Sequence, residues 1–160
     1  MNIYEAPPKK YVWLDCDPGI DDMIAIMLAA QNPCLSLLGI STISGNATIS
    51  NINKNALDII NISGHQTIPV FQGSSEPMCR KFVKSNAHGS TGLGPIFVLP
   101  EHLLKIKNEN LFSYLSKQIL SLPTKITLIS TGPLTNYALL LKTFPEVKKN
   151  IDSIVFMGGF

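Results

Sequence analysis

Cysteine and charge are both scarce in this sequence. Three of the 160 residues are cysteines and 15% are charged, whereas about a quarter of the residues are charged in typical globular proteins. Cys16, Cys34 and Cys79 are widely spaced and form no Cys-x-x-Cys pair. This spacing argues against a zinc or redox motif and against a disulfide framework. We therefore expect a reducing compartment and a chain with much buried sheet.

Long apolar runs and dense charged runs are also missing. The longest clean apolar run, MIAIMLAA, is too short to cross a bilayer. The N-terminal MNIYEAPPKK lacks the apolar stretch of a secretory signal. The formal net charge is +2 and no basic run is dense, which argues against nucleic-acid binding. We expect a cytoplasmic protein that binds neither nucleic acid nor membrane.

Apolar runs alternate with helical patterns along the chain. Runs typical of buried strands occupy residues 11–16, 35–43, 67–71, 125–130 and 153–157. Helices are predicted from Ile20, from Ile49 to a stop at Gly64, within 109–121 and over 133–141. Such alternation implies βαβ units and a mostly parallel sheet. We expect a Rossmann-like α/β fold, with an open sheet and flanking helices, as a single domain over residues 1–160.

The first two predicted helices carry apolar stripes. The first stripe is Ile20, Met23, Ile24, Met27 and Leu28, and the second is Ile49, Ile52, Ala56, Ile59 and Ile60. We expect both stripes to be core and not part of a cofactor site. Residues 72–100 then interrupt the alternation with many glycines and prolines. A long irregular connection of this kind is usually functional or disordered, and we interpret it as an active-site loop.

Four carboxylates crowd into the eight residues DCDPGIDD, directly after the first predicted strand. Asp15 and Asp17 lie at the strand end, and Asp21 and Asp22 lie in the first helical turn. Capping explains acids at a helix start but not carboxylates at the end of an apolar strand, where burial is costly. Calcium and magnesium ions bind carboxylate and carbonyl oxygens. The cluster therefore predicts a metal site at the carboxyl edge of the sheet.

Other strand ends bring further residues to the same edge. Asn46 follows the second predicted strand, Thr131 follows the fourth and Met157 closes the fifth. Each has an ordinary alternative, since asparagine is common in turns and threonine caps helices. His88 lies in a glycine-rich loop, where a lone histidine is most often solvated. We expect His102 to be a surface residue.

Five segments of the chain together resemble one known family. They are DCDPGIDD (15–22), ISGN (43–46), HGSTGLG (88–94), ISTGPLTN (129–136) and IVFMGG (154–159). Their order and approximate spacing are similar to those of the calcium-dependent nucleoside hydrolases of the inosine-uridine preferring type. The resemblance covers essentially the whole chain from Tyr11 to Gly159.

This resemblance implies a metal site and a catalytic base. Asp17 and Asp22 would coordinate Ca²⁺, and Thr131 would add its backbone carbonyl. Asp15 would fix the turn from behind. Calcium would make a bound water easier to deprotonate, and Asp17 would act as the general base. The implied reaction is hydrolysis of the N-glycosidic bond of a ribonucleoside, with oxocarbenium-like charge developing on the sugar and ribose and free base as products.

The resemblance also implies a sugar pocket. Asp21 and Asn46 would hydrogen-bond to ribose hydroxyls, Met157 would line the pocket and His88 would lie near the sugar and base. The substrate would be a nucleoside such as inosine or uridine, and the choice between purine and pyrimidine stays open. Members of the family are commonly dimers or tetramers, so a homo-oligomer of the full-length form is also implied.

Chains of this family are considerably longer than 160 residues. Their second half supplies another calcium-ligating aspartate, an Asn and Glu set that grips the ribose, and often a histidine that protonates the leaving base. The present sequence stops at MGGF, just past a predicted strand end. We therefore expect a truncated fold, the N-terminal half of a nucleoside hydrolase, with weak or no activity by itself.

Two alternatives remain open. The chain could be an inactive remnant or binding module that retains weak affinity for metal or ribose. It could also be a haloacid-dehalogenase-type phosphatase, because LDCD (14–17) resembles the Asp-x-Asp start of that family and LIST (128–131) resembles its Ser/Thr strand. Asp15 would then be the nucleophile, with magnesium as cofactor. The Pro18-Gly19 turn and the second acid pair fit that family poorly.

Overall fold

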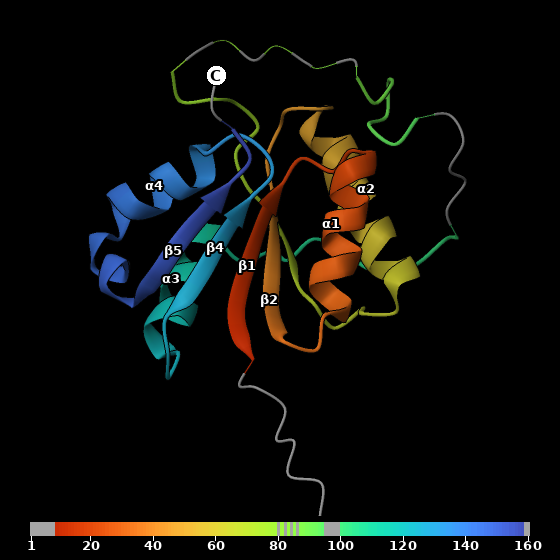
Figure 1. Ribbon diagram of the computed structural model, residues 1–160. Helices are drawn as coiled ribbons and strands as arrows, with labels where there is room; N and C mark the ends of the chain where they lie inside the picture. The colour runs from red at the N-terminus through yellow and green to blue at the C-terminus, as the bar shows by residue number, and fades with distance from the viewer. Residues whose placement is uncertain are drawn as a thin grey trace, which may run out of the picture.

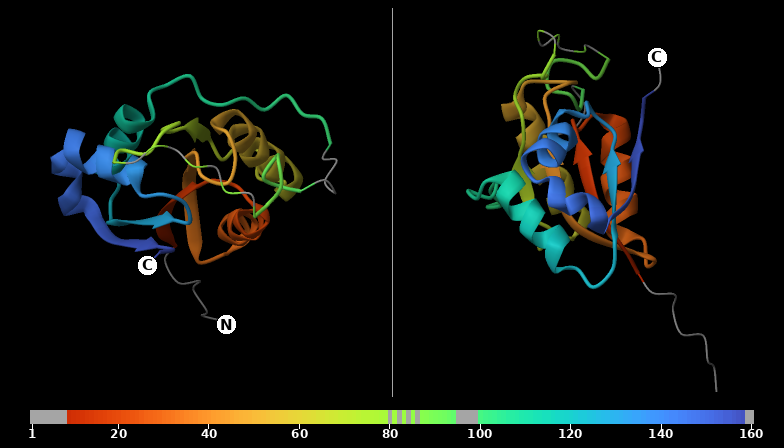
Figure 2. Two further views of the ribbon diagram at one scale, coloured as in Figure 1. Left: turned by 90° about the horizontal axis from the view of Figure 1, so that it is seen from above. Right: turned by 90° about the vertical axis from the view of Figure 1, so that its left-hand side faces the viewer.

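The computed structural model describes residues 9–79, 81, 83, 85, 87–94 and 100–158. These residues form a five-stranded sheet in which every strand pairs in parallel with its neighbours, in the order β3-β2-β1-β4-β5. Helices lie on both faces of this sheet, and the right-hand view of Figure 2 shows α1 and α3 on opposite sides of it. The predicted α/β fold with an open parallel sheet is confirmed.

The observed elements follow the predicted alternation, and their ends differ by a few residues. The strands are β1 (Lys10–Cys16), β2 (Leu35–Thr42), β3 (Val70–Gln72), β4 (Ile126–Ser130) and β5 (Ile151–Phe156). The helices are α1 (Ile20–Gln31), α2 (Ile49–Ser63), α3 (Leu111–Ser121) and α4 (Thr135–Thr143), and a 3₁₀ helix, η1, spans Pro145–Asn150. The largest difference is β3, which is shorter than the predicted run 67–71.

The strand order reverses at β1. The chain places β2 and then β3 on one side of β1, and it returns to place β4 and then β5 on the other side. In open α/β sheets, ligands bind outside the carboxyl ends of the strands where the order reverses. That point lies between β1 and β4, at the top edge of the sheet in Figure 1. The DCDPGIDD segment spans the end of β1 and the start of α1, so the fold delivers it to this edge.

Each face of the sheet has its own apolar cluster. On one face, α1 and α2 pack on Leu14, Cys16 and Ile40. On the other face, α3, α4 and η1 pack around Trp13 and Leu128. All five of these side chains are at most 2% exposed, and they come from the three central strands. Burial on both faces of the sheet explains why the strands read as nearly continuous apolar runs.

The predicted core stripe of α1 is wrong for Ile20, Ile24 and Leu28, which are exposed, and only Met23 and Met27 pack against the core. Ile24 is 54% exposed and Leu28 is 66% exposed, whereas Ile26, outside the predicted stripe, is fully buried. Met23 and Met27 are partly buried beside the core. Helix α1 is apolar on almost every side, in the sequence IDDMIAIMLAAQ. Periodicity therefore could not fix which side faces the sheet.

The stripe of α2 is confirmed for most of its length. Ile52, Ala56, Ile59 and Ile60 are each at most 1% exposed. The helix ends at Gly64, whose φ of 76° is left-handed and favours glycine. The polar residues of the opposite side of α2 separate the two faces, which is why the periodicity was informative here.

The connection between β3 and α3 has no helix or strand among its described residues, and part of the predicted loop 72–100 lies outside the described residues. His102 is not the surface residue that was predicted, because its side chain is 12% exposed. Its Nε2 lies 2.9 Å from Oδ1 of Asp58 on α2, and the Lys54 ammonium donates to the other oxygen. In this described portion of the chain, no helix is long and apolar enough to span a membrane.

Candidate active site

The acidic turn joins β1 to α1. Strand β1 ends at Cys16 and helix α1 begins at Ile20, so Asp17, Pro18 and Gly19 form the connection. The Gly19 N–H donates a 2.9 Å hydrogen bond to Oδ2 of Asp22, as in a capping box. The capping alternative is therefore correct for one oxygen of Asp22. Capping does not account for the second oxygen of Asp22 or for the Asp17 carboxylate.

Thr131 lies beside Asp22. Its hydroxyl donates a hydrogen bond to Oδ1 of Asp22, and its backbone N–H donates to the Asp15 carbonyl at 3.0 Å. Thr131 directly follows β4, which pairs with β1 in the sheet. The structure thus brings together two of the three residues predicted to bind metal, across the point where the strand order reverses. Ligation by the Thr131 carbonyl remains a prediction.

Asp17 lies between the segments that follow β2 and β4. The Asn46 N–H donates to Oδ2 of Asp17 at 2.8 Å, and the Asn46 amide Nδ2 donates to the Asp17 carbonyl at 3.0 Å. A Cβ atom on Gly45 would lie 2.1 Å from Oδ2, and one on Gly132 would lie 2.7 Å from Oδ1. The sequence reasoning missed both glycines. The available signal was a glycine shortly after each of two strands, in SGN and STG.

The two carboxylates are buried without a partner of opposite charge. Asp17 is 6% exposed and Asp22 is 2% exposed, and no ion pair among the described residues involves either one. Burial, and then repulsion from Asp22, raise the pKa of Asp17 to about 7. Burial likewise raises the pKa of Asp22. Two unpaired buried carboxylates are unfavourable in isolation, and a divalent cation between them would remove the repulsion. The donor set fits a hard cation.

Asp17 and Asp22 are not part of a larger cluster of potential metal ligands in the portion of the chain that the structure describes. Within the described ranges, no group of three or more His, Cys, Asp or Glu side chains is arranged to hold a metal ion. The predicted set of two carboxylates and one carbonyl is consistent with this. Hard cations such as calcium take about six to eight oxygen ligands, so further ligands are needed from water, substrate or other residues.

Asp15 lies behind the turn and is fully buried. Its Oδ1 accepts hydrogen bonds from the Ser41 hydroxyl and from the Asn136 amide, while Oδ2 has no partner among the described residues. Burial raises the pKa of Asp15 to about 7. A side chain with no exposed surface cannot attack a phosphate ester, which argues against the phosphatase alternative. Asn136 also donates to the Thr42 carbonyl at 3.0 Å, so this network braces the ends of β1 and β2.

The remaining predicted residues reach the same edge in different ways. His88 Nε2 lies 3.4 Å from Oδ1 of Asp21. The Asp21 side chain is 58% exposed and the His88 side chain 21% exposed, so both are accessible to a ligand. Met157 follows β5, and its N–H donates to the Ser130 carbonyl at 2.9 Å. No hydrogen bond joins Met157 to the carboxylates in the described part of the chain, so its place in a pocket remains a prediction.

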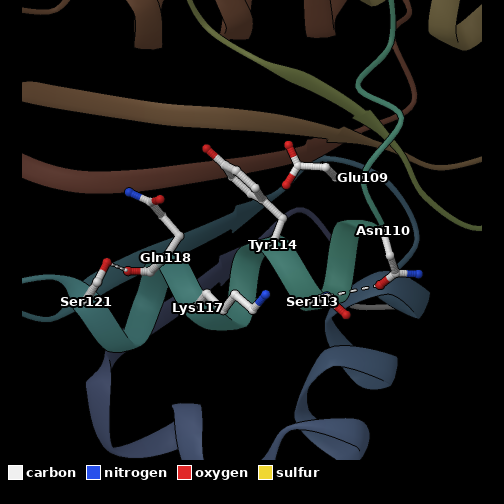
Figure 3. Close-up of a pocket in the computed structure, with 7 residues that line it drawn as sticks. All are labelled: Glu109, Asn110, Ser113, Tyr114, Lys117, Gln118 and Ser121. Atoms are coloured by element: carbon white, nitrogen blue, oxygen red, sulfur yellow. Dashed lines mark hydrogen bonds between the residues drawn. The ribbon is translucent and has the colours of Figure 1, made fainter.

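A separate cavity of about 530 Å³ lies along α3. Figure 3 shows its lining, which is Glu109, Asn110, Ser113, Tyr114, Lys117, Gln118 and Ser121. Asn110 uses its side chain to accept from the Ser113 N–H at the start of the helix. None of the predicted site residues lines this cavity. Its polar groups come almost entirely from one helix face and do not converge on a point, so the acidic turn remains the better candidate site.

Comparison with known proteins gives the same family by sequence and by structure. Residues 12–160 match the model of the family described as inosine-uridine preferring nucleoside hydrolase. The pyrimidine-specific ribonucleoside hydrolase RihA of Shewanella woodyi is 43% identical over 148 residues, which cover 91% of this chain and 47% of that protein. The inosine-uridine preferring nucleoside hydrolase of Crithidia fasciculata is 36% identical over 154 residues, 95% of this chain and 49% of that protein.

A solved structure, the purine-preferring ribonucleoside hydrolase from Gardnerella vaginalis, superposes with a TM-score of 0.87 at 32% sequence identity. The superposition covers 94% of this chain and 49% of the solved chain. The chain spans about half the length of the curated relatives it matches. Because the family match includes the acidic turn and the segments after β2, β4 and β5, the chain belongs to the inosine-uridine preferring nucleoside hydrolase family.

Proposed function

We propose that these 160 residues form the metal-binding and ribose-binding half of a ribonucleoside N-glycosidic hydrolase. The observation that carries the proposal is the pair of buried carboxylates, Asp17 and Asp22, which have no ion-pair partner among the described residues and lie at the point where the strand order reverses. Family membership supports the same reaction. The relatives contain about as many residues outside the matched region as within it, so the activity of a complete enzyme goes beyond this chain.

The proposed cofactor is Ca²⁺. Asp17 and Asp22 would hold the cation through their carboxylates and Thr131 through its backbone carbonyl. When bound, the cation would supply Lewis-acid chemistry by lowering the pKa of water in the site. The Thr131 hydroxyl and the Gly19 N–H orient Asp22 from two sides, so its carboxylate is preorganised. This support fits calcium and does not by itself distinguish it from other hard cations.

Asp17 is the proposed general base. Its Oδ2 is held by the Asn46 N–H, and the missing side chain at Gly132 leaves room beside Oδ1. Oδ2 is thus anchored, and Oδ1 is the proposed acceptor of the proton from water. The negative charge of the turn would also stabilise positive charge that develops on the sugar.

The proposed ribose contacts lie on the exposed side of the turn. Asp21 presents its carboxylate beside His88, and Asn46 lies next to Asp17. The described segment 87–94, which carries His88, would border this side, and Met157 would line the pocket at the end of β5. The base would lie near His88. The relatives include pyrimidine-specific and purine-preferring enzymes by name, so the base preference is left open.

The test is calcium-dependent ribose release from inosine and uridine. In any longer chain that contains these 160 residues, we expect release that Asp17→Ala abolishes. Asp152→Ala changes an exposed aspartate of β5 and is the matched control. Ribose release that survives Asp17→Ala would contradict the proposed role of Asp17. Tight nucleoside binding without release would favour the binding-module alternative, and phosphate trapped on Asp15 would favour the phosphatase.

A separate result is expected for the 160-residue chain alone. It should bind calcium and nucleoside weakly and should show negligible turnover, because it spans about half of each relative. Robust turnover by a verified intact preparation would contradict this expectation. Mass spectrometry of the sample before and after the assay establishes that the chain has its full mass.

A further inference from the structure

A buried amide joins two segments of the candidate site that are distant in sequence. Asn55 lies in the middle of α2 and is 4% exposed. Its Nδ2 donates to the Pro18 carbonyl at 3.0 Å and to the Thr91 carbonyl at 2.9 Å. Pro18 belongs to the acidic turn, and Thr91 belongs to the loop that carries His88. The proposed catalytic turn and the histidine loop are thus bonded to the same nitrogen atom.

The loop packs closely at this point. Gly92 has a φ of 95°, and a Cβ atom there would lie 2.9 Å from Nδ2 of Asn55 and 3.2 Å from the Pro18 carbonyl oxygen. Leu93 is 4% exposed and belongs to the same apolar cluster as α2. Residues 91–93 are therefore anchored by a polar contact, a close backbone approach and an apolar side chain.

His88 is carried by the anchored segment. The Gly94 N–H donates to the His88 carbonyl at 2.9 Å and closes the loop on itself. The imidazole then lies over the acidic turn, where a Cβ atom on Gly19 would be 2.8 Å from its Cδ2. Its Nε2 is 3.4 Å from the Asp21 carboxylate. His88 thus lies over the acidic turn and three residues before Thr91, which Asn55 holds.

We infer that Asn55 is a positioning residue that holds the His88 loop against the acidic turn, so that a nucleoside meets the histidine and the carboxylates as one preformed unit. The identity of the ligand rests on the proposed function, whereas the anchoring does not. A side-chain amide suits the position because its nitrogen carries two hydrogens for two carbonyl acceptors. An aspartate would offer none, and an apolar residue would leave both carbonyls, of which that of Pro18 is buried, without this donor.

Hydrogen exchange of the loop tests the anchor directly. In Asn55→Asp, which keeps the shape and removes both donors, amides in peptides covering residues 88–94 should exchange at least about tenfold faster than in the unmodified chain. Peptides from β4 should be unchanged. Asn61→Asp makes the same chemical change near the end of α2, where the side chain bonds to Gln66, and should leave the loop unchanged. Loop rates within about twofold of the unmodified chain in folded Asn55→Asp would overturn the inference.

A second variant separates positioning from general stability. Asn55→Ala removes the donors without adding charge and serves if Asn55→Asp does not fold, with the same expectation for loop exchange. With Ca²⁺ present, it should weaken inosine binding about tenfold and leave calcium affinity within about twofold. Equal loss of both affinities would indicate a merely structural role and would overturn the inference. If the unmodified chain does not bind inosine, the proposed function fails and the exchange experiment alone decides the role of Asn55.

Discussion

The Thr131 hydroxyl donates a hydrogen bond to Oδ1 of Asp22, a residue 109 positions earlier in the chain. The other oxygen of Asp22 accepts from the Gly19 N–H. The carboxylate is therefore held by the segments that follow β1 and β4, on either side of the point where the strand order reverses, and Asp22 is 2% exposed. A buried carboxylate held in this way, close to a second one, is unfavourable without a compensating charge, and Asp22 is a proposed ligand of a cation.

Removing the Thr131 hydroxyl should loosen Asp22. Thr131→Val keeps the shape and the backbone carbonyl, so we expect calcium affinity to fall about three- to tenfold and the free energy of unfolding to fall by about 1 kcal/mol. Calorimetric titration and urea unfolding measure the two effects. Thr127→Val is the matched control, since its hydroxyl contacts Ser153 on the neighbouring strand. Equal calcium affinity in the two variants would show that the hydroxyl does not orient Asp22.

Filling the space at Gly45 should displace the Asp17 carboxylate. A Cβ atom there would lie 2.1 Å from Oδ2, so Gly45→Ala forces the carboxylate to move. We expect calcium affinity to fall at least about tenfold, as expected for loss of a charged ligand. Gly64→Ala is the control, because it strains a left-handed helix end but has open space around it. It should lower the melting temperature without changing calcium affinity, and a Gly45→Ala protein that binds calcium normally would contradict the described geometry.

Replacing Asp15 by alanine should lower the free energy of unfolding, because the two side chains that donate hydrogen bonds to Asp15 lose this acceptor. Asp15→Ala leaves the Ser41 hydroxyl and the Asn136 amide without their acceptor, and we expect a loss of about 2–3 kcal/mol in the free energy of unfolding. Asp15→Asn keeps an acceptor oxygen and should cost less. Urea unfolding at one fixed pH compares the two variants. If the alanine variant is as stable as the asparagine variant, the bracing role assigned to Asp15 is wrong.

The orientation of α1 has its own stability test. Ile26→Ala empties a fully buried position and should lower the free energy of unfolding by about 2–5 kcal/mol. Ile24→Ala changes a half-exposed position two residues earlier and should cost less than about 1 kcal/mol. Denaturant unfolding distinguishes the two. The reverse order of costs would mean that the predicted stripe, and not the observed face, packs on the sheet.

Much of the fold could be predicted because the signals are local. Five apolar runs and the patterns between them gave the parallel α/β sheet, and α2 showed its buried face through Ile52 and Ile59. The buried face of helix α1 could not be predicted in this way, because Ile24, Ile26 and Leu28 are all strongly apolar. Tertiary packing decides which of them faces the sheet. His102 was misplaced for a similar reason, since its partner Asp58 lies 44 positions earlier in the chain.

The residues of the candidate site also fall into two groups, those in a continuous sequence motif and those defined by contacts between distant segments. The acidic turn is one continuous motif, so the sequence itself points to a metal site there, and the ligand roles of Asp17 and Asp22 remain predictions. Asn55, Gly45 and Gly132 matter through contacts with segments that the fold brings to them. The two glycines follow strand ends, which was a weak signal, whereas Asn55 lies within a helix and nothing near it in the sequence marks its contacts. Such residues become visible once the strand order fixes which loops are neighbours.

The central claim is that Asp17 and Asp22 together bind calcium. Isothermal calorimetric titration of the chain with Ca²⁺ tests it most directly, compared with Asp17→Asn, Asp22→Asn and the exposed-site control Asp152→Asn. We predict one weak site, with a Kd on the order of 10⁻⁴ to 10⁻³ M, that is lost in each of the first two variants and retained in the control. Absence of binding, or binding that survives both substitutions, would contradict the account.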